Sequence, residues 1–470
     1  VVEEMRLFME PRSVAIIGAS RNTSEEGFFN SLECLLEYQY PGQIYPVNPT
    51  TDEILGLKVY PNVTHLPDAI DLAVITVPRH AVVPAIRECA EKGIRAMIVV
   101  TQGFGDADAT GKALQEEMVQ IARAAGARIL GPNTMGVINA YARFSSAFVS
   151  LVKPERKLPL GVIGQSGFAV YVGLLTHPLG IPWIGAKGID VGNTCDIDQA
   201  DALEYLASDP QTKVIALHLE GVKNGRRFLE VASRASRIKP VLALKVGVSE
   251  SGARAVASHT GALVGQDQVY DAMLRQAGVI RVGDPEELED LAKAFATLPP
   301  IQGRRIAVLT PVGGLGVISA DACGQWGLEL ASFSPATMQR LQELYPSWMS
   351  IGNPLDVWPA AFAARYASVF GQAAEIVLED PNVDGMMCII WSSGPRYDFF
   401  EPVAEVKELV ARYQKPIVAY MYGPQCQEAA CRMEDGTAIA VYPSPTRAVR
   451  ALGALWRYQV SQKRLVDWTG

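Results

Sequence analysis

The chain has 470 residues, and its 49% hydrophobic and 20% charged residues are typical of a folded globular protein and exclude wholesale disorder. A formal net charge of −8 disfavours a broadly basic surface for nucleic acid. At roughly 150 residues per domain, this length predicts about three domains.

Cysteine usage and the absence of long apolar runs indicate the cytoplasm. The seven cysteines include no CxxC pair, which suits a reducing compartment. Residues Val1–Glu10 lack the basic segment and apolar core of a signal peptide, and no apolar run reaches the roughly 18 residues of a membrane helix. No residues show the spacing of metal ligands. We therefore expect a cytoplasmic protein with no membrane segment and no metal site.

Short apolar runs alternate with amphipathic stretches in the first third of the chain. The stretches over Ala81–Lys92 and Lys112–Ala125 predict helices. Continuous apolar strands separated by helices are typical of a parallel sheet that is covered on both faces. The runs that predict strands here are Ser13–Ile17, Ile44–Val47, Leu72–Val77 and Ala96–Thr101.

The same alternation restarts twice further along the chain. It restarts at Leu160–Ile163 and again at Arg305–Thr310, after breaks at Lys153–Lys157 and Leu298–Gly303. Later runs that predict strands are Val214–Leu219, Val241–Lys245, Met386–Ile390 and Ile417–Tyr420. The pattern predicts an α/β protein of three doubly wound domains over residues 1–152, 153–299 and 300–470.

Small and polar residues follow the predicted strands of the first domain. A glycine such as Gly18 at a strand end lets the backbone approach a phosphate at the start of the next helix, although the full GxGxxG fingerprint is absent. Ligands of open parallel sheets bind at the carboxyl ends of strands, so these residues favour an extended nucleotide across the sheet edge, with ordinary turns as the alternative. They are Gly18, Ser20, Asn48, Pro49, Val77, Pro78, Gln102, Gly103 and Asn133.

Two glycine-containing segments resemble catalytic motifs only superficially. The segment Gly164–Gly167 would need a further glycine at Phe168 to form a serine-nucleophile elbow. A helix start that holds phosphate through N–H groups near Ser166 and Gly167 fits better, with simple helix capping as the alternative. The segment Gly105–Lys112 has the wrong spacing for an ATP-binding loop, and the next residue is alanine rather than serine or threonine.

One of the five histidines stands apart from the others. His259 lies in the small-residue stretch Gly252–Gly265, where we expect an accessible loop, and a neutral imidazole there can attack phosphorus. Glu220 ends a predicted strand, and a carboxylate beside an imidazole fixes its tautomer and stabilises its charged form. A non-catalytic loop histidine and a solvated strand-end acid are the alternatives.

Together these motifs resemble a known family, over nearly the whole chain. The chain is similar to the alpha subunit of ADP-forming acetyl-CoA synthetase, in the NDP-forming acyl-CoA synthetase family, and more distantly to the alpha subunit of succinyl-CoA ligase. The stretch around His259 is the most specific match. The matching segments are Ser13–Ser20, Ile44–Pro49, Ile129–Asn133, Gly136–Ile138, Gln165–Gly167, Gly192–Asn193, Leu219–Gly221, Ala257–Leu263 and Gly352–Asp356.

The resemblance implies a role for each domain. The first would be a Rossmann-like CoA-binding domain that uses the strand-end residues above. The second and third would be flavodoxin-like domains of the succinyl-CoA ligase type. In the second, Gln165, Ser166 and Gly167 would hold phosphate, and His259 would be phosphorylated with support from Glu220. The implied reaction interconverts acyl-CoA, ADP and phosphate with a carboxylic acid, CoA and ATP, through an acyl phosphate and a phosphohistidine.

The resemblance also implies partners. An ATP-grasp subunit or domain would supply ATP or ADP with Mg²⁺, so we expect a hetero-oligomer or dimer. Two segments depart from the family pattern. Thr134 stands where relatives often carry cysteine, and Arg21–Glu26 is acidic where relatives often carry glycine and lysine. A non-catalytic CoA-binding regulatory protein of the same fold is one alternative, and a nicotinamide-dependent dehydrogenase is another.

Overall fold

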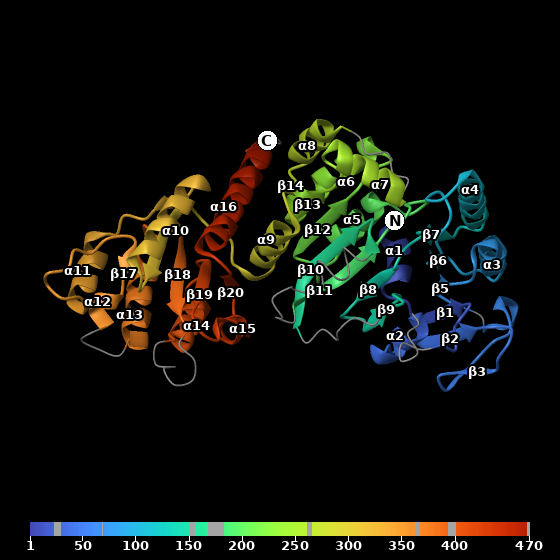
Figure 1. Cartoon of the computed structure of the whole chain (residues 1–470), viewed down its shortest axis with the longest axis horizontal. Coiled ribbons are helices and arrows are strands. Elements are labelled where there is room, and N and C mark those ends of the chain that lie inside the picture. Colours follow the sequence, from blue (N-terminus) through green and yellow to red (C-terminus); the bar gives the residue numbers. More distant parts are fainter. Residues whose placement is uncertain are drawn as a thin grey trace. The chain divides into compact units, whose positions relative to one another are not determined.

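The structure is a computed structural model that describes residues 1–22, 30–67, 69–149, 156–167, 183–260, 266–361, 366–392 and 401–467. The chain divides into two compact units, Val1–Leu288 and Glu289–Gly470 (Figure 1). The first unit holds a five-stranded and a seven-stranded sheet, and the second holds a six-stranded sheet. Among the described residues, no helix has the length and hydropathy that a membrane crossing requires.

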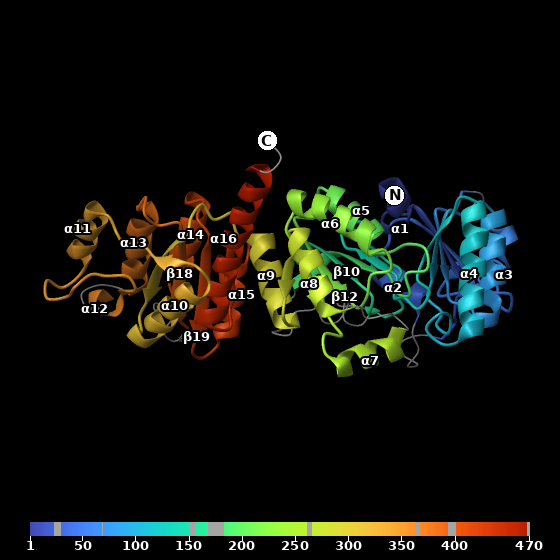
Figure 2. The ribbon, with the colours of Figure 1, turned by 90° about the horizontal axis from the view of Figure 1, so that it is seen from above.

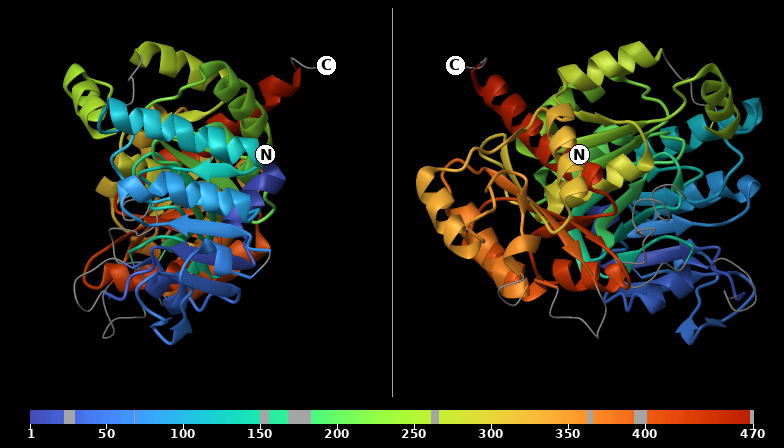
Figure 3. Two further views of the ribbon diagram at one scale, coloured as in Figure 1. Left: turned by 90° about the vertical axis from the view of Figure 1, so that its right-hand side faces the viewer. Right: turned by 60° about the vertical axis from the view of Figure 1, so that its left-hand side comes forward.

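The five-stranded sheet is wholly parallel. Its strands, in spatial order, are β2 (Gln43–Val47), β1 (Ser13–Ile17), β5 (Leu72–Ile75), β6 (Ala96–Val99) and β7 (Arg128–Leu130). Both faces of the central strands are buried because helices cover them. Helices α3 and α4 lie side by side against one face (Figures 2 and 3). The helices are α1 (Val2–Met9), α2 (Ser31–Glu37), α3 (Arg79–Glu91) and α4 (Ala109–Ala124).

Short elements decorate this sheet. The strands β3 (Glu53–Ile54) and β4 (Leu57–Lys58) form a small antiparallel pair, and the 3₁₀ turn η2 covers Val63–His65. Polar caps set the starts of two helices: Asn30 accepts from backbone N–H groups of α2, and Asp108 does so for α4.

The seven-stranded sheet is parallel except at one edge. Its strands, in spatial order, are β14 (Ile280–Val282), β13 (Val241–Lys245), β12 (Val214–Leu219), β10 (Arg156–Gly164), β11 (Trp183–Asp190), β8 (Val137–Asn139) and β9 (Phe144–Ser145). The last two strands pair antiparallel. The helices are α5 (Gln199–Ser208), α6 (Gly225–Ile238), α7 (Glu250–Thr260) and α8 (Asp267–Gln276).

One apolar core joins the two sheets of the first unit. Residues of the five-stranded sheet, such as Ile16 and Val74, belong to the same buried cluster as Ile163, Ile189 and Leu217 of the seven-stranded sheet. Because protein cores are close-packed, this shared core holds the edges of the two sheets at a defined spacing.

The second unit contains a parallel six-stranded sheet. Its strands are β16 (Glu329–Leu330), β15 (Arg305–Thr310), β18 (Gly385–Trp391), β19 (Ile417–Tyr422) and β20 (Ile439–Tyr442), with β17 (Leu355–Asp356) paired to β15. Its helices are α10 (Gly313–Gln325), α11 (Pro335–Leu344), α12 (Trp358–Ala361), α13 (Tyr366–Glu379), α14 (Val403–Arg412), α15 (Cys426–Glu434) and α16 (Pro445–Asp467). Helix α9 (Pro285–Thr297) spans the boundary between the units.

The predicted class, α/β with parallel sheets, is confirmed. Two local expectations were wrong. Strand β10 begins at Arg156, inside the predicted break, and helix α7 continues to Thr260, so His259 lies on a helix rather than in a loop. Strands β8 and β9 precede residue 152 yet pair with the seven-stranded sheet. The boundaries at residues 152 and 299 stay a prediction.

Candidate active site

The strand ends of the five-stranded sheet are joined around Gly18. This residue has φ +92°, and a Cβ built on it would lie 2.8 Å from Val77 Cγ1, so a glycine is required by both conformation and space. Its N–H donates to the carbonyl of Val47 (3.0 Å), and Asn48 Nδ2 donates to the carbonyl of Ala19 (2.8 Å). The predicted residues at the ends of β1, β2 and β5 are therefore in mutual contact.

The remaining strand ends of this sheet continue the same edge. Thr101 Oγ1 donates to the carbonyl of Val77 (2.7 Å), and the N–H of Asn133 donates to the carbonyl of Thr101 (3.1 Å). Asn133 has φ +58°, which turns the chain sharply after β7. The carboxyl ends of β5, β6 and β7 thus form one continuous hydrogen-bonded edge.

Asp106 organises the turn that follows β6. Its carboxylate accepts from the N–H groups of Gly103 (3.1 Å) and Phe104 (2.9 Å), and from Asn193 Nδ2 (2.6 Å). Burial by itself raises the pKa of Asp106, but these hydrogen bonds, led by that from Asn193, bring it below its ordinary value. The predicted residue Gly103 is thereby tied to Asn193, which follows β11.

Gln165 connects the predicted phosphate turn to Glu220. Its Oε1 accepts from the backbone N–H groups of Glu220 (2.8 Å) and Gly221 (2.9 Å). Gln165 is 7% exposed and Glu220 is 3% exposed, which excludes a solvated strand-end acid at position 220. The helix predicted after Gly167 falls on residues 168–182, which lie outside the described part of the chain.

Asp190 is a buried carboxyl group at the end of β11. Its Oδ2 accepts from the N–H of Met135 (2.7 Å), and its Oδ1 accepts from the N–H of Gly192 (3.2 Å). Burial, only partly offset by these bonds, raises the pKa of Asp190 to about 6, and the negative charge of Glu220 adds to the rise. The group is therefore ionised at neutral pH, at a cost in free energy.

A single cavity of about 520 Å³ joins the two sheet edges. It brings together Gln102 and Asn133, predicted for CoA, with Gln165, Ser166 and Gly167, predicted for phosphate. Among the described residues that line it, Asp190 alone carries an ionisable side chain. The full described lining is Thr76, Val100, Thr101, Gln102, Asn133, Thr134, Met135, Phe148, Gln165, Ser166, Gly167 and Asp190.

Other predicted site residues do not belong to the described lining of this cavity. They are Gly18, Ser20, Asn48, Pro49, Val77, Pro78, Gly103 and Glu220. His259 lies one residue before the end of α7, and its side chain is outside the described part of the chain. Within that part, no cluster of histidine, cysteine, aspartate and glutamate has three potential metal donors.

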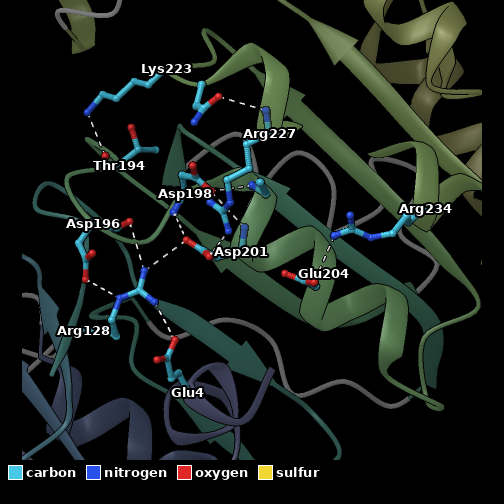
Figure 4. A network of polar contacts seen from close by, with 12 residues as sticks. Glu4, Arg128, Thr194, Asp196, Asp198, Asp201, Glu204, Lys223, Arg227 and Arg234 are labelled. Carbon is cyan, nitrogen blue, oxygen red and sulfur yellow. Dashed lines mark hydrogen bonds and ion pairs between the residues drawn. The ribbon is translucent and has the colours of Figure 1, made fainter. Parts of the chain in front are cut away.

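A polar network fixes the segment 192–201 beside the cavity (Figure 4). Arg128 Nε donates to Asp196 Oδ2 (2.9 Å) and its Nη1 to Glu4 (2.7 Å). Lys223 Nζ donates to the carbonyls of Asn193 (2.8 Å) and Thr194 (2.9 Å). The segment is therefore held from β7 and from the loop that follows β12, and Glu4 of α1 holds Arg128 in place.

Sequence reasoning missed several lining residues. Thr76 and Thr101 stand at strand ends, so the rule that selected Gln102 could also have selected them. Asp190 likewise ends a strand, but only its contacts with the segment before β8 make it distinctive. Val100, Met135 and Phe148 carry no polar signal that separates them from core residues.

Three family models match the chain. The CoA binding domain matches residues 12–140, the succinyl-CoA ligase like flavodoxin domain matches residues 158–295, and the ligase-CoA domain matches residues 306–466. The first two models contain every described lining residue except Phe148, with Gln102, Asn133 and Thr134 in the first and Gln165 and Asp190 in the second.

Named relatives match over almost the whole chain. The alpha subunit of ADP-forming acetate–CoA ligase II of Pyrococcus furiosus is 35% identical over 95% of this chain and 96% of its own length. ADP-forming acetate–CoA ligase II of Archaeoglobus fulgidus is 36% identical over 97% of this chain, which spans 67% of that relative. The solved structure of dinucleotide forming acetyl-coenzyme A synthetase 1 from Ca. Korarchaeum cryptofilum, in complex with phosphate and ADP, has a TM-score of 0.85 at 32% identity and covers 99% of this chain and 98% of its own. The chain therefore belongs to the family of ADP-forming acetate–CoA ligases, the NDP-forming acyl-CoA synthetases, as an alpha-type subunit.

Proposed function

We propose that this chain interconverts acyl-CoA, ADP and phosphate with a carboxylic acid, CoA and ATP, through an acyl phosphate and a phosphohistidine at His259. The observation that carries the proposal is the shared cavity. Its lining combines Gln102 and Asn133 from the edge predicted for CoA with Ser166 and Gly167 from the turn predicted for phosphate. A thioester and a phosphate must meet for acyl transfer, and one cavity lined by both sets of residues provides for that meeting.

In the first step, an oxygen of phosphate attacks the thioester carbonyl carbon. The carbon–sulfur bond breaks, and CoA leaves as the thiol with the proton released by phosphate. Backbone N–H groups at Ser166 and Gly167 would neutralise the phosphate charge. The apolar side chains of Val100, Met135 and Phe148 line part of the cavity, where they would limit the access of water to the acyl phosphate.

In the second step, an imidazole nitrogen of His259 attacks phosphorus and the carboxylate leaves. Glu220 would stabilise the charged ring. Gln165 supports this role because its Oε1 holds the N–H groups of Glu220 and Gly221 while its own segment leads into Ser166. In the third step the phosphoryl group would pass to ADP, giving ATP and restoring His259.

An ATP-grasp partner is part of the proposal, and it would bring ADP and Mg²⁺. The similar Pyrococcus furiosus protein is named as an alpha subunit, and the Archaeoglobus fulgidus relative is longer than this chain. We propose a cytoplasmic hetero-oligomer with that partner. The relatives' names include acetate and 4-hydroxybutyrate, so the proposal names only a small carboxylic acid as the substrate class.

The test is phosphorylation of the chain itself. The chain is mixed with the ATP-grasp partner from the same genome, Mg²⁺ and ATP labelled on its γ-phosphate, beside the His259→Ala variant. We expect an acid-labile, base-stable label on the wild-type chain and none on the variant. An unlabelled wild-type chain, with a partner shown to be active on another alpha subunit, would overturn the catalytic proposal. Retained CoA binding in that case would favour the non-catalytic regulatory alternative.

A further inference from the structure

Asp190 lies where three segments of the first unit converge. Its main chain binds the segment before β8, because its N–H donates to the carbonyl of Gly136 (2.9 Å) and its carbonyl accepts from Thr134 Oγ1. Its carboxylate binds the same segment through the N–H of Met135. This residue thus fixes segment 134–136, of which Thr134 and Met135 line the cavity next to Asn133, a residue predicted for CoA.

The third segment is the turn Gly164–Gly167, predicted to hold phosphate and called the phosphate turn below. It packs closely against Asp190. A Cβ built on Gly167 would lie 2.5 Å from Met135 Cγ and 2.7 Å from Asp190 Oδ2. Real Cβ atoms do not approach other heavy atoms so closely, so Gly167, Met135 and the Asp190 carboxylate are in close contact at this point. Any movement of the carboxylate or of Met135 therefore alters the spacing between the two sides of the cavity.

We propose that Asp190 is a positioning residue that holds segment 134–136 against the phosphate turn, so that acyl transfer between CoA and phosphate depends on its carboxylate while phosphorylation of His259 from ATP does not. The inference rests on the proposed function, because it assigns the two transfers to this site. Asp190 acts through the chain's own backbone groups, and its negative charge makes it a poor ligand for phosphate.

A carboxylate is needed at position 190 because two backbone N–H groups donate to different oxygens of the side chain. Met135 N–H donates to one oxygen and Gly192 N–H to the other. An asparagine offers one acceptor oxygen, so its amino group would face one of the two N–H donors. The Asp190→Asn variant must then shift residue 135 or residue 192, although its volume hardly changes.

The test compares two partial reactions of the Asp190→Asn variant. The first is exchange of labelled CoA into acetyl-CoA in the presence of inorganic phosphate, which requires both sides of the cavity. The second is labelling of His259 from ATP with the partner, which requires the phosphate side alone. We expect exchange to fall roughly tenfold to hundredfold, mostly in kcat rather than in KM for CoA, because misplacement by about 1 Å has effects of that size. Labelling should stay within about twofold of wild type, since it uses no CoA-side group.

Two further variants keep the test decisive. Asp209→Asn removes another buried carboxylate of the same unit, which pairs with Lys187 (2.9 Å) outside the described lining of this cavity, and should leave the exchange-to-labelling ratio unchanged. Thr134→Val removes the hydroxyl that donates to the Asp190 carbonyl, and should lower exchange in the same direction if the first variant folds poorly.

Each outcome decides between the claims. Equal exchange in wild type and the Asp190→Asn variant would overturn the positioning role. So would a parallel loss of both reactions in the Asp190→Asn variant, or an Asp209→Asn variant that shows the same selective loss. A wild-type chain that exchanges CoA but shows no labelled histidine would instead overturn the phosphohistidine part of the proposed function and leave the role of Asp190 in acyl transfer standing. A wild-type chain that does neither would overturn both.

Discussion

The two sheet edges that meet at the cavity are held in different ways. At the five-stranded edge, main-chain hydrogen bonds join the strand ends, as from Gly18 N–H to Val47 and from Asn133 N–H to Thr101, and the Asn48 and Thr101 side chains add to them. At the seven-stranded edge, buried side chains do so, as Gln165 and Asp190 accept from backbone N–H groups of neighbouring segments. Backbone strain should therefore have its main effect at the first edge, and changes in buried polar atoms and in close packing should have theirs at the second.

Gly167→Ala should have the largest effect, because it adds a Cβ atom where the turn predicted to hold phosphate is closely packed. The added Cβ would lie 2.5 Å from Met135 Cγ and 2.7 Å from Asp190 Oδ2, so the turn must move. Loss of aligned N–H donors at a reacting anion lowers rates by roughly a thousandfold. We expect a loss of that size in phosphate-dependent CoA exchange and in labelling of His259.

The control for this substitution is Gly225→Ala, at the first position of α6. A Cβ there would meet nothing within 4 Å, and alanine favours the helix. This variant should keep wild-type rates and equal or greater stability. Similar losses in both variants would show that the Gly167 contact is not the cause, and would remove the main support for close packing at this edge.

The second prediction uses the charge of Asp190. Its pKa is raised from 3.8 to about 6, so the folded chain holds this proton more tightly than the unfolded chain. That stabilisation is complete below about pH 4 and is lost as the pH rises through about 6, a change of about 3 kcal/mol. Asp190→Asn does not titrate, so its free energy of unfolding relative to wild type should rise by about 3 kcal/mol from pH 4 to pH 7.

Denaturant unfolding of both proteins at several pH values measures this difference. The difference between the two proteins is the quantity to compare, because groups remote from Asp190 titrate alike in both. If the difference in free energy of unfolding stayed constant between pH 4 and pH 7, the Asp190 carboxyl group would be solvated. The argument that the seven-stranded edge is held by buried polar side chains would then lose this residue as support.

Gly18→Ala tests the five-stranded edge and should have a smaller effect. The residue has φ +92°, and its Cβ would lie 2.8 Å from Val77 Cγ1 and 3.1 Å from Val77 N. We expect the Kd for CoA to rise roughly tenfold, since this edge shifts only locally. Gly56→Ala shares the positive φ (+77°) but meets nothing within 4 Å, so it separates backbone strain from crowding. Equal effects of the two substitutions on CoA binding would contradict the crowding argument.

The sequence predicted the five-stranded edge well for a physical reason. Buried parallel strands are short apolar runs, and the residue after each run must lie at the ligand edge, so Gly18, Gln102 and Asn133 could be selected without knowing any contact. The sequence also selected Gln165 and Glu220, whose segments are joined by a hydrogen bond from Glu220 N–H to Gln165 Oε1, and the roles of both residues stay a prediction.

The rest of the site depends on contacts between distant segments. Asp190 and Met135 are 55 positions apart, and nothing in either local pattern shows that they meet. The loop expected around His259 was wrong because small residues there suggested a turn, whereas alanines also favour the helix that is present. Strand β8 joining the seven-stranded sheet was likewise invisible, since pairing partners are set by tertiary packing.

Lys223→Met should give the smallest effect, because it loosens the five-stranded edge only indirectly. Lys223 Nζ donates to the carbonyl of Thr194 (Figure 4) and to that of Asn193, whose side chain in turn donates to Asp106 beside Gly103. Methionine keeps the stem of the side chain and removes these donors, which should lower the free energy of unfolding by about 1 kcal/mol. The KM for CoA should rise by about twofold, while labelling of His259 stays unchanged, because the phosphate side keeps its contacts.

The exposed Lys213→Met variant is the matched control and should change neither quantity. A loss of labelling in the Lys223 variant would show that the two edges are coupled through segment 192–194. That result would contradict the proposal that the CoA side and the phosphate side respond separately to substitutions.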